Sequence, residues 1–212
     1  MIVTHLGHSA VLLEVAGRRL LVDPGNFSTT WHELTGLDAV LVTHQHPDHV
    51  DPDHLPSLLA GNPDAQVRVE PQVLGALDLP SAVGLAAGDT FRLGEVTVTA
   101  VGGDHAVIHR DIPVIGNIGL VVAAPGEPTL FHPGDALAAV PAGIDVLAVP
   151  AYGPWAAMKE TVDFARAVGA PQGFPIHDGL LNERGRALVI NRVSEMTPTQ
   201  LVDLVDGAPH QF

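Results

Sequence analysis

The sequence predicts a layered α/β protein built on two β-sheets. Apolar, β-branched runs of strand length recur along the 212 residues, and both halves of the chain place such runs ahead of helical spacing. The 22 glycines and 18 prolines are spread through the chain, as expected for turns between many short elements. Because the composition does not change sharply anywhere, we expect one domain spanning residues 1–212.

Most of the expected elements are strands. Short glycine-containing segments at 15–19, 93–95 and 125–128 separate pairs of apolar runs, so they predict hairpins and antiparallel pairing. The expected strands are Ile2–Leu6, Ala10–Ala16, Arg19–Val22, Ala39–Val42, Val67–Glu70, Thr90–Leu93, Val96–Val101, Gly119–Ala123, Thr129–Phe131 and Val146–Val149.

Helical spacing is clearest over Lys159–Val168, where the pattern ends at Gly169. Two further segments, Asp53–Leu59 and Thr199–Val205, show weaker helical spacing. We expect the chain from Pro198 onward to form a short terminal helix with a loose end.

Composition and charge exclude several classes of protein. A chain that is 46% hydrophobic and 16% charged is not intrinsically disordered. Its net charge of −14 repels phosphate backbones and anionic lipids, so we expect no nucleic-acid partner and no membrane insertion. The first residues show no basic segment followed by an apolar stretch, and no apolar run reaches about 18 residues. We therefore expect a soluble, cytoplasmic protein.

The chain contains no cysteine but 12 histidines. The absence of cysteine excludes disulfides, thiolate zinc sites, iron–sulfur clusters and cysteine nucleophiles. Any metal must therefore be bound by histidine and carboxylate side chains.

The most specific motif is His44-Gln45-His46-Pro47-Asp48-His49, which directly follows the expected strand Ala39–Val42. Given the histidine and aspartate content, this pattern would arise by chance about 0.003 times in such a chain. Imidazole and carboxylate groups are ligands of Zn²⁺ and, with more oxygen, of Mn²⁺ or Fe. The motif therefore favours a metal site over a solvated polar loop.

Six residues cannot complete two coordination spheres, so further ligands must come from elsewhere in the chain. His105, Asp135 and His177 each follow a strand-like run, with glycine or proline close by. Because the loops at one edge of a sheet converge, these three residues are candidate ligands. Taken singly, each could equally be an ordinary turn residue.

The order of these residues resembles the metallo-β-lactamase superfamily of metal-dependent hydrolases. The opening Leu6-Gly7-His8-Ser9 and the later Leu21-Val22-Asp23-Pro24-Gly25 resemble the branch that contains ascorbate-6-phosphate lactonase. N-acylphosphatidylethanolamine phospholipase D is similar in motif too. The resemblance implies a four-layer αβ/βα sandwich: two mixed sheets with helices outside and a dinuclear site at one edge.

The resemblance also implies a role for each candidate. The first metal would be bound by His44, His46 and His105, the second by Asp48, His49 and His177, with Asp135 bridging both. The resemblance implies two divalent ions per chain, with Zn²⁺ as the preferred metal and Mn²⁺ or Fe as alternatives. A hydroxide held by both ions would attack a small ester, lactone or phosphorylated metabolite. We assign Asp135, Asp48 and His8 to catalysis, and the cationic centre predicts an anionic small-molecule substrate.

Several alternatives remain open at the level of sequence. The missing cysteine disfavours two β-lactamase subclasses, and His46 stands where flavodiiron oxygen reductases carry glutamate. A phosphodiesterase acting on a nucleotide or lipid headgroup is the alternative enzyme, and a non-catalytic metal-binding scaffold or sensor is the other class. A homo-oligomer is also compatible with the sequence.

Four residues near the candidate ligands have two interpretations each. Asp23 is either a turn residue or a buried carboxylate that orients a metal-bound imidazole. His109 either contacts substrate or lies on a solvated turn. Tyr152 and Trp155 either pack in the core or form a pocket wall.

Overall fold

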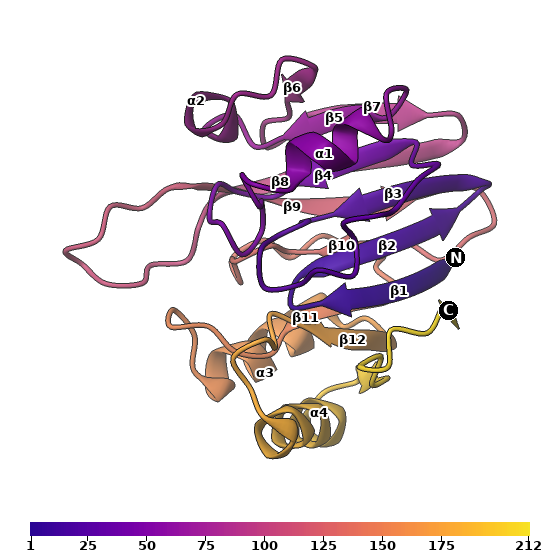
Figure 1. Ribbon diagram of the computed structural model, residues 1–212. Helices are drawn as coiled ribbons and strands as arrows, with labels where there is room; N and C mark the ends of the chain where they lie inside the picture. Colours follow the sequence, from indigo (N-terminus) through magenta and orange to yellow (C-terminus); the bar gives the residue numbers. More distant parts are fainter.

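The computed structural model describes residues 1–212 and shows two seven-stranded mixed sheets that face each other, with helices on the outside (Figure 1). The order of strands in the first sheet is β14-β1-β2-β3-β4-β5-β6, and in the second it is β13-β12-β11-β10-β9-β8-β7. The predicted fold class, a four-layer α/β sandwich with two mixed sheets, is confirmed.

Both sheets combine antiparallel and parallel pairs. In the first sheet, β1 and β2 pair antiparallel, as do β2 and β3, whereas β3 to β6 are parallel. The strands of this sheet are β1 (Ile2–Gly7), β2 (Ala10–Val15), β3 (Arg18–Val22), β4 (Ala39–Val42), β5 (Gln66–Val69), β6 (Ala82–Gly84) and β14 (His210–Gln211).

In the second sheet, β7 to β10 are antiparallel neighbours and β10 to β13 are parallel ones. The strands of this sheet are β7 (Thr90–Leu93), β8 (Val96–Asp104), β9 (Gly116–Ala123), β10 (Leu130–His132), β11 (Val146–Pro150), β12 (Gln172–Ile176) and β13 (Gln200–Leu201). The three predicted hairpins are present, between β2 and β3, β7 and β8, and β9 and β10.

The alternation of side chains along the strands builds three apolar layers. In β4, Ala39 and Leu41 belong to the cluster between the sheets, whereas Val40 and Val42 belong to the cluster under α1 (Leu55–Ala60) and α2 (Val73–Ala76). The second sheet uses its outer face in the same way to pack against α3 (Met158–Val168) and α4 (Glu183–Met196). None of these helices has both the length and the apolar character needed to cross a bilayer.

The strand directions bring the polar strand ends to one edge. The pairings make β1, β3 and β4 run in the same direction in the first sheet, and β8, β10 and β12 in the second. The candidate residues that follow these strands, or lie just beyond them, are His8, Asp23, His44, His105, Asp135 and His177. The topology therefore gathers loops that are up to 169 residues apart in the sequence, from His8 to His177.

The C-terminal expectations were wrong. Gln200 and Leu201, in the segment expected to be helical, form β13 beside β12, and the backbone N–H of Val202 donates to Gly173 of β12. Instead of a loose terminal helix, the chain ends in β14, which pairs antiparallel with β1. In both places the backbone hydrogen bonds go to a neighbouring strand, which a local helical pattern cannot reveal.

Candidate metal centre

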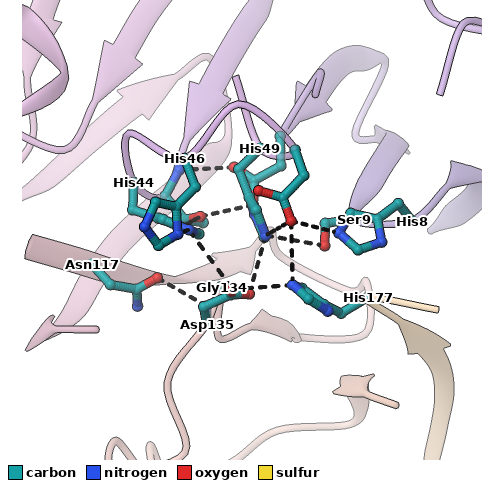
Figure 2. Close-up of polar contacts among 12 residues, drawn as sticks. His8, Ser9, His44, His46, His49, Asn117, Gly134, Asp135 and His177 are labelled. Carbon is teal, nitrogen blue, oxygen red and sulfur yellow. Dashed lines mark hydrogen bonds and ion pairs between the residues drawn. The ribbon is translucent and has the colours of Figure 1, made fainter. Parts of the chain in front are cut away.

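Two groups of potential ligands meet at the edge where the strand ends converge (Figure 2). In each group the ligand atoms lie within 4.8 Å of one another. The first group consists of His44, His46, His105 and Asp135, and the second of His8, Asp48, His49 and His177. All seven residues that the sequence predicted as ligands are thus together, and they fall into the two expected sets, with His8 added to the second.

The carboxylate of Asp135 lies between the two groups. Its Oδ1 is 3.1 Å from Nε2 of His49, and its Oδ2 is 3.1 Å from Nε2 of His177, both in the second group. The same Oδ2 is 3.4 Å from Nε2 of His105 in the first group. Asp135 therefore occupies the place that a bridging ligand would take.

Three buried atoms at the centre have ion-pair neighbours at 3.1–3.4 Å but no well-aligned hydrogen bond: Nε2 of His105, Nε2 of His177 and Oδ1 of Asp135. Leaving a buried polar atom without a hydrogen-bond partner costs about 1–3 kcal/mol. The clustering of three such atoms around one point suits a bound cation. Neutral imidazole nitrogens and a carboxylate oxygen are donors that divalent transition metals accept, so the residues present fit such ions.

In several of the histidines, Nδ1 contacts an oxygen atom on the side of the ring away from the centre. Nδ1 of His49 lies 2.7 Å from Oδ2 of Asp23, and Nδ1 of His105 lies 2.6 Å from the carbonyl oxygen of Ala106. The Nδ1 of His177 contacts the carbonyl oxygen of Tyr152. Such contacts place the proton on Nδ1 and leave Nε2 free to bind a metal.

Asp23 links the two groups. The side chain is fully buried and accepts hydrogen bonds from the backbone N–H and the hydroxyl of Thr43, at 2.8 and 2.7 Å, besides facing His49. Because the Thr43 hydroxyl donates to Asp23, its oxygen is free to accept from Nδ1 of His44, 3.0 Å away. Asp23 thus orients His49 of the second group directly and His44 of the first group through Thr43. This arrangement favours the interpretation of Asp23 as an orienting carboxylate over that of a turn residue.

The backbone is strained at three positions of the centre. His8, Asp23 and His177 have φ values of 53°, 48° and 55°, a left-handed conformation that costs a non-glycine residue about 1–3 kcal/mol. Each residue directly follows a strand, and the turn redirects its side chain into the centre. Only one other non-glycine residue, Ala16, has a positive φ, and it lies in a hairpin turn. The strain is therefore concentrated where the side chains must converge.

His8 supports Asp48 from the side opposite the first group. The backbone N–H of Gly179 donates to Nδ1 of His8, at 3.1 Å, so the proton of the neutral ring sits on Nε2. Nε2 lies 3.0 Å from Oδ2 of Asp48 and donates to it. Burial lowers the pKa of His8, which keeps this ring neutral at pH 7.

The carboxylates set the protonation of the second group. Burial alone would lower the pKa of His177, but its contacts with Asp135 and Asp48 outweigh burial and raise it to about 9. Burial also opposes protonation of His49, yet Asp135 and Asp23 raise its pKa well above the usual range. Conversely, burial disfavours the charge on Asp135, while His49, His105 and His177 hold its pKa well below that of an ordinary aspartate. Burial likewise disfavours the charge on Asp48, but hydrogen bonds from His177 and His8 lower its pKa, so each group holds an anionic carboxylate at neutral pH.

Metal binding is expected to release protons and to strengthen as the pH rises. A metal takes the place of a proton on a ligating nitrogen, and the metal-free His177 holds its proton up to a pH of about 9. Below that pH, displacement of the His177 proton should make the apparent affinity rise by about tenfold per pH unit. Calorimetric zinc titrations at pH 7 in buffers of different ionisation enthalpy measure the protons released; heats that do not depend on the buffer would contradict this expectation.

The remaining candidates divide into those at the centre and those outside it. The indole N–H of Trp155 donates to Oδ2 of Asp135 at 3.1 Å, so Trp155 is part of the centre. His109 lies on the loop between β8 and β9 that projects to one side in Figure 1, where its side chain is 57% exposed and near Asp111. Tyr152 has an exposed side chain and contributes to the centre through its backbone carbonyl.

Sequence reasoning missed Asn117. This buried side chain accepts a hydrogen bond from the backbone N–H of Asp135 at 2.9 Å and donates to the carbonyl oxygen of Pro133 at 3.0 Å. A Cβ on Gly134, which has a φ of 61°, would lie 2.3 Å from the Asn117 side-chain oxygen, so glycine permits this close approach. Asn117 therefore holds the loop that presents Asp135, but nothing in its local sequence marks this role.

A third histidine–aspartate group lies outside the centre, formed by His32, Asp51 and His54. In this group the carboxylate of Asp51 is already hydrogen-bonded within a turn of the chain. Asp51 accepts hydrogen bonds from the backbone N–H groups of Asp53 and His54, and its other oxygen is 2.7 Å from Nδ1 of His54. These bonds fix the turn that leads into α1.

Comparison with known proteins gives three findings. Residues 2–177 match the family described as the beta-lactamase superfamily domain. The chain is 46% identical over the full length of both chains to Protein Rv0786c of Mycobacterium tuberculosis. It is also 35% identical to a UPF0173 metal-dependent hydrolase of Xanthobacter autotrophicus, over 64% of this chain and 62% of that protein.

The fold has solved counterparts. The structure superposes on the metallo-beta-lactamase fold protein YhfI of Bacillus subtilis with a TM-score of 0.75, covering 100% of this chain and 99% of the other, at 15% identity. The two-sheet arrangement is therefore shared although few residues are.

Proposed function

The chain belongs to the beta-lactamase superfamily of metal-dependent hydrolases. We propose that it uses two divalent metal ions, with Zn²⁺ as the preferred metal, to hydrolyse a small ester, lactone or phosphorylated metabolite. The observation that carries the proposal is the position of Asp135, whose carboxylate lies within 3.1–3.4 Å of histidines from both ligand groups. A carboxylate shared in this way suits two ions better than one.

Each side chain would have a defined part in holding the ions. We assign His44, His46 and His105 to one ion, Asp48, His49 and His177 to the other, and Asp135 to both. When bound, such a pair of ions lowers the pKa of a water molecule, so that hydroxide forms at neutral pH, and polarises the substrate's electrophilic group. The contacts of Asp23 with His49 and Thr43 keep the imidazoles in place during turnover.

Asp48 and His8 are placed to orient the attacking water molecule. Asp48 is the more exposed of the two central carboxylates, with 20% of its side chain exposed against 3% for Asp135. Hydrolysis of an ester joins the oxygen of water to the carbonyl carbon, breaks the bond to the alcohol oxygen and transfers a proton to that leaving group. In our proposal Asp48 orients the attacking water by accepting a hydrogen bond from it, and the proton that this water gives up passes to the leaving alcohol. The hydrogen bond donated by His8 keeps Asp48 ionised and oriented beforehand.

Removal and restoration of metal tests the proposal. Protein treated with a chelator should lose hydrolysis of a panel of p-nitrophenyl esters, lactones and phosphate esters, and added Zn²⁺ or Mn²⁺ should restore it. Far-ultraviolet circular dichroism before and after chelation separates loss of metal from loss of fold. Hydrolysis that persists after all metal has been removed would refute the proposal.

A further inference from the structure

A cavity of about 390 Å³ adjoins the centre on the side of His105. It lies between the start of the β8–β9 loop, the segment after Asp135 and the loop that carries Trp155. Its apolar lining comes from Ala106, Val107, Ala136, Leu137, Ala138 and Trp155. The volume is in the range of pockets that bind small molecules.

The cavity reaches the centre through two of its walls. One is His105, a candidate ligand of the first ion, and the other is Trp155, whose indole N–H donates to Asp135. The two rings stand edge to face, with their centroids 6.1 Å apart. A substrate whose reacting group lay between the ions could therefore extend an attached chain into this cavity.

The charges around the cavity disfavour an anionic group. Its charged lining residues, apart from the candidate ligand His105, are Asp104 and Glu160, and no lysine or arginine lines it. Phosphate recognition in proteins usually relies on such cationic side chains. An uncharged, apolar group would enter at lower cost than a phosphate, since it needs no counter-charge.

The larger cavity on the opposite side of the centre does not supply a cation either. This cavity, of about 710 Å³, adjoins His8 and contains Arg186. The guanidinium of Arg186 is already held by Asp178 and by Asp203, the latter at 2.6 Å. The charge of Arg186 is thus already neutralised by these two carboxylates.

We propose that the cavity beside His105 and Trp155 binds an uncharged, apolar acyl chain, so that the substrates are neutral esters or lactones with an aliphatic acyl part. The inference rests on the proposed function and narrows it by setting aside phosphorylated substrates, and it replaces the anionic substrate expected from the charge of the metal centre with a neutral one. Val107 is the residue best suited to a test, because it lines the cavity and is 61% exposed, so that its replacement should not disturb the core.

The first test compares acyl chain lengths in the zinc-loaded protein. We expect kcat/KM for p-nitrophenyl hexanoate to exceed that for p-nitrophenyl acetate by about tenfold or more, and p-nitrophenyl phosphate to react more slowly than either. Val107→Asp should lower the hexanoate value towards that of acetate, so that the hexanoate-to-acetate ratio of kcat/KM falls to about one. Val140→Asp is the matched control, since Val140 is 49% exposed and does not line the cavity.

A binding measurement keeps the test independent of turnover. Hexanohydroxamic acid should bind the zinc-loaded protein about tenfold or more tightly than acetohydroxamic acid, and Val107→Asp should remove this difference. Equal binding of the two hydroxamates, or a preference for the phosphate ester, would overturn the inference even where hydrolysis is observed. Chain-length-dependent binding without any hydrolysis would support the cavity's role and count against the proposed function instead.

Discussion

Asp135→Asn is expected to lower kcat/KM for hydrolysis by about 10³-fold or more, and to reduce the number of ions bound per chain. The carboxylate lies between the two ligand sets and contacts histidines of both, and its ionised form is favoured by His49, His105 and His177. Asparagine keeps the size but removes the charge, and a bound metal supplies several kcal/mol of transition-state stabilisation that would then be lost.

The matched control for this change is Asp163→Asn on the exposed side of α3, where the carboxylate contacts only Arg166, at 3.7 Å. It should leave activity and metal content as in the parent protein. Thermal melting followed by circular dichroism checks that both variants fold. A folded Asp135→Asn protein with parental activity and metal content would remove Asp135 from the mechanism.

Asp23→Asn is expected to weaken both the fold and the metal centre. The buried carboxylate accepts three hydrogen bonds, and an amide nitrogen in place of Oδ2 would face the donors of Thr43 and His49. Disrupting such a buried charged network costs about 3–5 kcal/mol in the free energy of unfolding. Because Asp23 orients metal-facing imidazoles, zinc affinity should also fall by about 10–100-fold.

Urea denaturation and competitive zinc titration measure the two effects separately. Asp38→Asn is a suitable comparison, because Asp38 also accepts a backbone hydrogen bond, from Arg19 at 2.8 Å, but lies outside both ligand groups. It should cost some stability and leave zinc affinity unchanged. If Asp23→Asn reduced stability alone, the orienting role of Asp23 would be wrong.

The sequence carries enough information to predict which side chains gather at the candidate centre, because the pattern that marks them is local. The motif at 44–49 follows a strand directly, and His105 and His177 also stand just past strand-like runs. Since strand ends converge at a sheet edge, residue type and position together predict a shared site. The strands themselves were predictable for the same reason, because apolar alternation and β-branched residues depend on neighbours close in the sequence.

The remaining features depend on partners far away in the chain. Asn117 supports Asp135 through contacts across 16 and 18 residues, and polar side chains of this kind have no periodic signal. Helix α4, missed by sequence reasoning, carries Gly185 in its first turn and buries mainly Arg186, Val189 and Val193. Arg186 is buried there because Asp178 and Asp203 neutralise its charge. A charged residue on the buried face breaks the apolar pattern by which a helix is recognised in a sequence.

The measurement that tests the central claim most directly is the metal content per chain, by plasma mass spectrometry, of protein purified without chelator or added metal. A His54→Ala variant measured in parallel removes any ion held by the group at His32, Asp51 and His54. We expect two ions per chain in both proteins and fewer in Asp135→Asn. A content of one ion or none, which reconstitution with Zn²⁺, Mn²⁺ or Fe²⁺ fails to raise, would contradict the dinuclear centre.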